Sequence, residues 1–141
     1  MSEVDKELVQ MRLLEREAQA YAAQLELLLE TVRGSRMAVE TVEAVPGLKD
    51  GDEFLVPIGG GVIMRTEWGH RSGLLADLGA GVVVDLGPVE IRDLIDGRVH
   101  QMEAAITRIE EHLRGLRAQL AALNDKVQEK YEGSTDVQGP P

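Results

Sequence analysis

Two long segments of the chain place apolar side chains at intervals of seven residues, and this repeat constrains the fold more than any other feature. The first segment spans residues 4–42. One heptad position is held by Val4, Met11, Ala18, Leu25, Val32 and Val39. The position three residues later is held by Glu7, Leu14, Tyr21, Leu28, Ser35 and Val42. Such a sustained stripe is typical of a coiled coil, so we predict a coiled-coil helix within residues 1–46, capped by Ser2 and stopped by Pro46-Gly47.

A second heptad segment follows the centre of the chain. Its first position is held by Val99, Ile106, Leu113, Leu120 and Val127. Its other position is held by Ile95, Met102, Ile109, Leu116 and Leu123. We predict a helix over residues 88–132, with Pro88 in its first turn, Gly133 as its C-cap and a disordered tail over residues 133–141. Both helices should be roughly 60 Å long at ~1.5 Å per residue, and equal lengths around a central insert favour an antiparallel pair.

The centre, residues 47–87, contains one pattern twice. VPIGGGVIM (56–64) and ADLGAGVVV (76–84) align without a gap, twenty residues apart. Apolar residues alternate with polar ones around each G-x-G tripeptide, which predicts short half-buried strands joined by tight turns. The middle position changes from Gly60 to Ala80, whereas the flanking turn glycines recur at Gly59, Gly61, Gly79 and Gly81. We therefore predict positive φ angles at the flanking glycines.

Two successive β-hairpins provide one apolar face that is too small to be stable alone, and they leave their strand edges unpaired. We expect these edges to pair with other subunits in an intersubunit β-barrel. The predicted fold class is α+β: a long antiparallel α-helical coiled-coil hairpin with two central β-hairpins that join this barrel. The candidate assembly residues are Phe54, Val56, Ile58, Val62, Met64, Trp68, Leu74, Leu78, Val82, Val84 and Leu86.

Composition argues against several other classes of protein. A formal net charge of −10 disfavours nucleic acid as a partner. No apolar run approaches ~20 residues, so we expect no membrane span. The chain has no cysteine, and its first ten residues lack the apolar core of a signal peptide, which favours a cytoplasmic location.

The sequence also contains no pattern that indicates an enzyme. The glycine clusters do not continue into a phosphate-binding motif, and the histidines lack the spacing of zinc ligands on one helix face. The many carboxylates lie on solvated helices rather than in an implied cleft. We therefore expect no catalytic residues, no metal site and no cofactor, and the chain is not expected to be an enzyme.

The order of these segments is similar to a known family. A heptad helix, EFLVPIGGGVIMRTE, LLADLGAGVVVDL and a second heptad helix together resemble alpha-type subunits of the prefoldin family, over about residues 4–131. Two hairpins point to the alpha type because beta-type subunits carry one. The resemblance implies an ATP-independent chaperone, built as a hexamer of two alpha and four beta prefoldin subunits on a double β-barrel platform. Its coiled-coil tips would hold non-native polypeptides and pass them to a group II chaperonin.

The free end of the coiled coil is the predicted client site. The last turns have no further partner, so the seam can fray there and offer apolar surface to an unfolded chain. The candidate residues are Val4, Leu8, Met11, Leu123, Val127 and Tyr131. Two alternatives stay open at this stage. These residues can be ordinary seam residues, and the same fold can serve as a structural coiled-coil spacer or a filament-forming prefoldin-like assembly protein.

Overall fold

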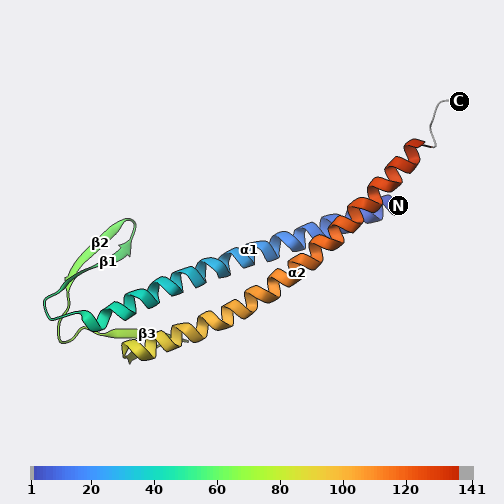
Figure 1. The fold of residues 1–141 in the computed structure, drawn as a ribbon. Helices are drawn as coiled ribbons and strands as arrows, with labels where there is room; N and C mark the ends of the chain where they lie inside the picture. Colours follow the sequence, from blue (N-terminus) through green and yellow to red (C-terminus); the bar gives the residue numbers. More distant parts are fainter. Residues whose placement is uncertain (1, 137–141) are drawn as a thin grey trace. The chain divides into compact units, whose positions relative to one another are not determined.

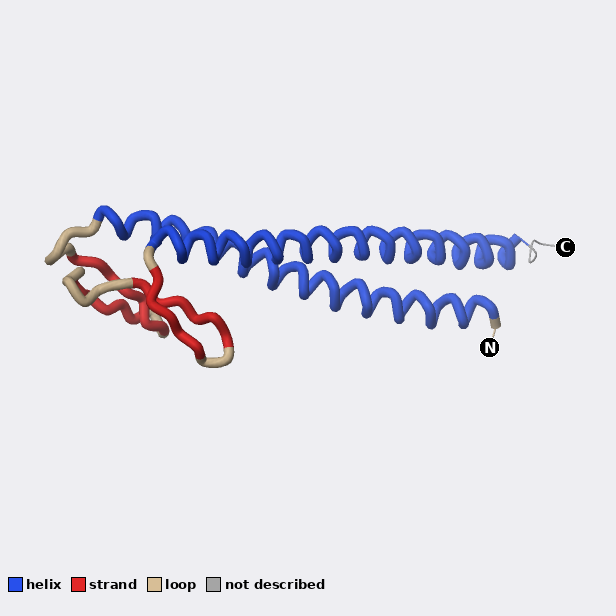
Figure 2. The backbone as a smooth tube through the Cα atoms, turned by 90° about the horizontal axis from the view of Figure 1, so that it is seen from below, coloured by secondary structure: helices blue, strands red, loops and turns tan. Residues whose placement is uncertain are grey.

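The structure, a computed structural model, describes residues 2–136 as two long helices and two β-hairpins (Figure 1). Figure 2 shows the helices in blue and the strands in red. The elements follow in the order α1 (Glu3–Ala44), η1 (Val45–Gly47), β1 (Glu53–Gly59), β2 (Val62–Glu67), β3 (Leu74–Gly79), β4 (Val82–Leu86) and α2 (Pro88–Asp136). This order confirms the predicted fold class of two helices around two hairpins.

The chain divides into two compact units. The helical unit contains residues up to Thr31 and from Met102 onward, and the hairpin unit contains Val32–Gln101. Each long helix contributes to both units. Among the described residues, neither helix has a segment apolar enough to cross a membrane.

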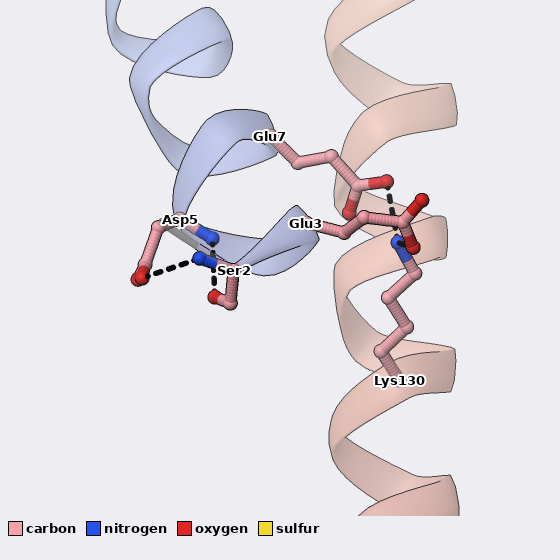
Figure 3. A network of polar contacts seen from close by, with 5 residues as sticks. All are labelled: Ser2, Glu3, Asp5, Glu7 and Lys130. Carbon is pink, nitrogen blue, oxygen red and sulfur yellow. Dashed lines mark hydrogen bonds and ion pairs between the residues drawn. The ribbon is translucent and has the colours of Figure 1, made fainter.

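Helix α1 has 42 residues and begins where the sequence predicts. The backbone N–H of Asp5 donates to Ser2 Oγ at 3.2 Å, and the backbone N–H of Ser2 donates to Asp5 Oδ2 at 3.3 Å (Figure 3). These reciprocal bonds satisfy donors that the first helical turn leaves unpaired. After Ala44 the chain tightens into η1, which contains Pro46, so the predicted stop is also confirmed.

The burial pattern confirms both predicted heptad stripes. Every residue named above for the four heptad positions is buried or half-buried. The best protected are Leu113 and Leu116, which are 3% and 5% exposed. In the helical unit the two stripes face each other in antiparallel order, because Lys130 near the end of α2 reaches Glu3 and Glu7 near the start of α1.

Helix α2 begins at Pro88, as predicted, but it continues through Gly133 to Asp136. The predicted C-cap at Gly133 is therefore wrong. A glycine costs only about 1 kcal/mol relative to alanine in a helix interior, and this cost alone does not end a helix. Residues 137–141 of the predicted tail lie outside the described part of the chain.

The two hairpins repeat each other in detail. Strands β1 and β2 pair antiparallel, as do β3 and β4, and each pair forms a separate two-stranded sheet. A register shift falls between Pro57 and Gly59 in the first hairpin and between Asp77 and Gly79 in the second. The repeat seen in the sequence is therefore a repeat of strands, turn and bulge.

Both turns have positive φ at the middle residue of the G-x-G tripeptide as well as at its two glycines. The φ angles are 110°, 59° and 76° at Gly59, Gly60 and Gly61, and 100°, 53° and 77° at Gly79, Ala80 and Gly81. The prediction for the flanking glycines is confirmed. The left-handed middle residue was not predicted, and it fits a two-residue type I′ turn, in which both central residues have positive φ.

Exchanging the middle residues should move the stability of the two hairpins in opposite directions. We expect Ala80→Gly to stabilise the second hairpin by about 1 kcal/mol and Gly60→Ala to destabilise the first by a similar amount, because a Cβ disfavours left-handed backbone. Hydrogen exchange of the strand amides would measure both effects. Changes of the same sign in the two hairpins would contradict this account of the turns.

The second hairpin packs against both helices inside the hairpin unit. Val42, Ala76 and Ile91 form the centre of this core, and the partly buried residues around it are Leu74, Val84, Leu86, Leu94 and Ile95. Arg98 Nη2 donates to the Asp77 carbonyl oxygen at 2.6 Å, and Asp77 Oδ1 accepts from the Gly79 N–H at 2.8 Å. These bonds hold the bulge of β3 beside α2.

Candidate functional surfaces

The six predicted client residues fall into two groups at the end of the helical unit. Leu8 and Tyr131 are exposed, at 37% and 61%. Val4, Met11 and Leu123 are half-buried in the seam, and Val127 is buried at 7%. Only Leu8 and Tyr131 therefore offer apolar surface directly, whereas the other four become available when the two helices separate.

A cluster of charges closes the seam at this end. Lys130 Nζ lies 2.8 Å from Glu7 Oε1 and 3.3 Å from Glu3 Oε2 (Figure 3). Lys130 follows Leu123 by seven residues, so it occupies the next place in that heptad position, opposite the polar place that Glu7 takes in α1. We call Glu3, Glu7 and Lys130 the ionic clasp.

We expect the ionic clasp to favour one register of the two helices. The Glu7 side chain is 18% exposed, and its second oxygen, Oε2, is buried without a hydrogen-bond partner among the described residues. A partly desolvated ion pair stabilises a fold little more than apolar contacts at the same place would. Separating the two partners, however, leaves an unpaired charge in the apolar seam, which lowers stability. Sliding α1 by one heptad against α2 would separate this pair.

The clasp should make stability depend on alkaline pH. The carboxylates raise the pKa of Lys130 above its ordinary 10.5, mainly through the hydrogen bond to Glu7, while burial acts in the opposite direction. A raised pKa in the folded state means that this stabilisation is complete below pH 10.5 and is lost as the pH rises through the folded value. We expect the thermal midpoint to fall more steeply above pH 10.5 in the unmodified chain than in Lys130→Met. Parallel pH profiles would contradict the role of the clasp.

A second polar contact between α1 and α2 involves His112. Its Nε2 lies 3.3 Å from Glu17 Oε1, and its ring meets Tyr21 edge-on with centroids 4.5 Å apart. His112 therefore connects the two helices as a half-exposed side chain. No cluster of three potential metal-binding side chains occurs in the described range, residues 2–136.

The predicted assembly residues also divide by exposure. Five are 49–61% exposed: Ile58, Val62, Met64, Leu78 and Val82. The half-buried ones are Phe54, Val56, Trp68, Leu74, Val84 and Leu86. Leu74, Val84 and Leu86 already pack within the chain against the core around Val42 and Ile91, so they are not free to meet another subunit.

The first hairpin has a smaller internal contact. Trp68 follows β2, and its ring lies 6.0 Å from the ring of Phe54 on β1. Its backbone N–H donates to the Asp52 carbonyl oxygen at 2.8 Å, which extends the pairing beyond the strand ends. Phe54 and Trp68 therefore close the base of this hairpin, and the exposed residues lie nearer its turn.

Comparison with known proteins places this architecture in a family. Residues 13–133 match the family described as "Prefoldin subunit". The chain belongs to the prefoldin family. A prefoldin relative from Methanocorpusculum labreanum, named "Prefoldin subunit alpha", is 31% identical over 129 residues, covering 86% of this chain and 88% of the relative. A second "Prefoldin subunit alpha", from Methanoregula boonei, is 29% identical over 115 residues, covering 82% and 74%.

A solved structure shares the prefoldin fold of this chain. It is a chain from the cryo-EM structure of filamentous PFD from Methanocaldococcus jannaschii, with a TM-score of 0.68 and 18% identity. The match covers 81% of this chain and 94% of that one. The resemblance suggested by the hairpin segments is therefore confirmed at the level of family and fold.

Sequence reasoning missed part of the apolar surface of this prefoldin hairpin unit. Leu55, Ile63, Leu75 and Val83 are 55–68% exposed on the strand faces opposite those predicted to be apolar. This second apolar face could have been found in the sequence, because every strand also has an apolar residue among the alternate positions that face the other way. Both faces of each hairpin thus carry exposed apolar side chains, and such patches mark interaction surfaces.

Proposed function

We propose that this chain is the alpha-type subunit of an ATP-independent prefoldin chaperone. It assembles with beta subunits in a hexamer of two alpha and four beta chains, captures unfolded polypeptides at its coiled-coil ends and delivers them to a group II chaperonin. The observation that carries this proposal is the match to relatives named "Prefoldin subunit alpha" over more than four fifths of the chain. The two hairpins of the described structure agree with the alpha type.

The hairpins support the assembly part of the proposal. Each two-stranded sheet has unpaired edges, and isolated hairpins are at best marginally stable in water. Exposed apolar residues on both faces, such as Ile58, Ile63, Val82 and Val83, give a neighbouring subunit an area to bury. Pairing with other subunits satisfies the edges and covers these side chains together.

The end of the helical unit supports the capture part. Leu8 and Tyr131 give an exposed apolar contact, and Val4, Met11 and Leu123 lie half-buried next to the end of the seam. Methionine adapts to many shapes, which suits clients without a fixed structure. A single end binds weakly, and several ends in one assembly gain affinity through effective concentration.

The capture site is tested by Leu8→Ser combined with Tyr131→Ser. We expect the assembly to remain intact and its suppression of client aggregation to fall by roughly tenfold, because several weak contacts are lost at once. Light scattering of a denatured client measures the suppression, and size exclusion measures the assembly. A matched control, Leu29→Ser with Met37→Ser, removes two exposed apolar residues elsewhere on α1 and should keep full activity. If the variant with Leu8→Ser and Tyr131→Ser protected the client as well as the unmodified chain does, these two residues would not form the capture site.

A second candidate function is a structural spacer or filament subunit. It is favoured by the shared fold with a chain of the filamentous assembly from Methanocaldococcus jannaschii. Electron microscopy of the purified chain, alone and with a beta subunit, distinguishes filaments from discrete particles. Filaments that persist in the presence of the beta subunit would favour this second function.

A further inference from the structure

We propose that Arg98 is a positioning residue, which fixes the direction of the second hairpin relative to the helices of the hairpin unit, while the first hairpin pivots on its connecting loops. Both hairpins belong to the hairpin unit, Val32–Gln101, so they can be compared within one compact part of the chain. The attachment is a property of the isolated chain. Its consequence for assembly, given below, rests on the proposed function.

The second hairpin is attached to α2 at two places. The first is the apolar core, where Ala76 on β3 is 8% exposed and packs with Val42 and Ile91. The second is the hydrogen bond of 2.6 Å that Arg98 Nη2 donates to the Asp77 carbonyl oxygen. Residue 98 follows Ile91 by seven residues, so its side chain leaves the side of α2 that lies beside β3 (Figure 1). A single contact lets a hairpin rotate about it, whereas two separate contacts fix its direction.

The bond between Arg98 and Asp77 is suited to orientation rather than to stability. A guanidinium group is planar and charged, so its hydrogen bonds are short and directional. Arg98 is exposed, and water competes for the same groups, so the bond adds little to the free energy of unfolding. Asp77 Oδ1 accepts from the Gly79 N–H at 2.8 Å, which holds the bulge in shape. The carbonyl oxygen that Arg98 meets is therefore presented in a defined direction.

The first hairpin has no equivalent attachment. Pro57 corresponds to Asp77 in the repeated pattern, and its side chain has no hydrogen-bond acceptor. Every hydrogen bond and ion pair that the described structure gives to residues 48–72 stays within residues 45–72. Within the described range, no residue of β1 or β2 is buried, and none belongs to the core around Val42 and Ile91. A segment held by so few contacts moves at a low cost in free energy.

Open space beside the base of the first hairpin leaves room for this movement. Trp68 lines a cleft of about 560 Å³, together with residues of η1, β3 and the start of α2 that include Pro46, Leu74 and Pro88. Side chains around an open cleft are not packed on each other as they are in a protein core. Trp68 therefore does not lock the base of the first hairpin to these elements.

The two hairpins would act differently in the proposed assembly. The second would set the angle at which a neighbouring subunit joins the helices, and the first would adjust to the subunit that it meets. Because the geometry of successive contacts decides how many subunits an assembly contains, loss of the Arg98 contact is expected to give complexes of several sizes in place of one.

The attachment is tested by pulsed electron paramagnetic resonance between two spin labels on the full chain, which has no natural cysteine. Met37→Cys gives a reference label on α1, at a residue 64% exposed. Val83→Cys and Ile63→Cys give labels at corresponding places in the second and first hairpins, at residues 55% and 58% exposed. We expect the distribution of distances from residue 37 to residue 83 to be roughly twofold narrower than that from residue 37 to residue 63. Equal widths would overturn the proposal.

Substitution of Arg98 provides the second criterion. Arg98→Ala should widen the distribution to residue 83 by roughly twofold and leave that to residue 63 unchanged. Arg98→Lys keeps a charged donor and should recover part of the narrow width. The matched control is Arg92→Ala, because Arg92 pairs with Asp93 on its own helix, and it should change neither distribution. Circular dichroism checks that the helices remain. An unchanged width in Arg98→Ala, or equal widening in Arg92→Ala, would contradict the role of Arg98.

Native mass spectrometry of the chain co-expressed with a beta subunit tests the consequence for assembly. The unmodified chain and Arg92→Ala should each give one main complex, and Arg98→Ala should give several. A single complex of unchanged mass with Arg98→Ala would exclude Arg98 from setting the angle between subunits. Absence of any complex with the unmodified chain would contradict the proposed function instead, while the label distances would still decide whether Arg98 fixes the second hairpin.

Discussion

Replacing Leu113 with alanine is expected to lower the free energy of unfolding by about 2–4 kcal/mol. Leu113 is 3% exposed and belongs to the α2 seam in the helical unit. The substitution removes apolar contacts and leaves a void that a pair of long helices closes only in part. Urea unfolding followed by far-ultraviolet circular dichroism measures the change.

The control is the same substitution on the outer side of α1. Leu27 is 65% exposed, so Leu27→Ala at low protein concentration should change the free energy of unfolding by less than about 1 kcal/mol. Alanine also has the highest helix propensity, which offsets part of the loss. Equal losses from Leu27→Ala and Leu113→Ala would contradict the heptad seam as the source of stability.

Ile58→Glu combined with Val82→Glu is expected to prevent assembly with a beta subunit without unfolding the chain. Ile58 and Val82 are 61% and 52% exposed in the isolated chain, so charges there meet water. In the proposed intersubunit barrel the same charges would be desolvated, and we expect binding to weaken by roughly a hundredfold or more. Native mass spectrometry of the co-expressed chains measures the loss of the complex.

Val84→Glu provides the contrasting control. Val84 faces the internal core around Val42 and Ile91, so a charge there should destabilise the hairpin unit even in the isolated chain. Comparison of the double variant with Val84→Glu distinguishes the proposed assembly surface from a strand face that is already covered within the chain. An intact complex with Ile58→Glu and Val82→Glu would remove these residues from the assembly surface.

The helices were predictable because the seven-residue spacing of apolar side chains indicates both that a segment is helical and which side of the helix is buried. Seven-residue spacing alone placed residues as distant as Val4 and Val39 on one stripe, and the structure buries or half-buries all of that stripe. The end of α2 was less predictable. Gly133 is a frequent cap residue, but whether a helix stops at glycine depends on the competition between local propensity and capping contacts.

The hairpins were predictable in position but only partly in orientation. The twin G-x-G tripeptides located both turns, whereas a strict alternation put Ile58 and Leu78 on the inner face. Each of these residues is the extra residue in a bulge, which interrupts alternation and leaves the side chain exposed. The sequence also could not assign Leu74 and Val84 to an internal core, because an apolar strand face looks the same whether its cover is a helix or another subunit.

The candidate client residues at the end of the helical unit were also only partly predictable. Leu8 and Tyr131 are exposed as an open contact site needs, whereas Val127 lies in the seam. The ionic clasp was visible in principle, since Lys130 extends the spacing of Leu123 by one heptad. It was missed because apolar spacing alone does not assign a partner to a charged residue at a heptad position.

In the proposed assembly, the duplicated hairpin would give one polypeptide two sites for binding other subunits. Both hairpins carry the same strand pairing, bulge position and turn conformation, so the two proposed binding sites share one backbone design, although only the second hairpin packs against the core around Val42 and Ile91. Units with two such binding sites form either closed rings or open chains, and the rotation between successive units selects the product. In such an assembly, a small change in the orientation of one hairpin would be sufficient to convert a finite particle into a polymer.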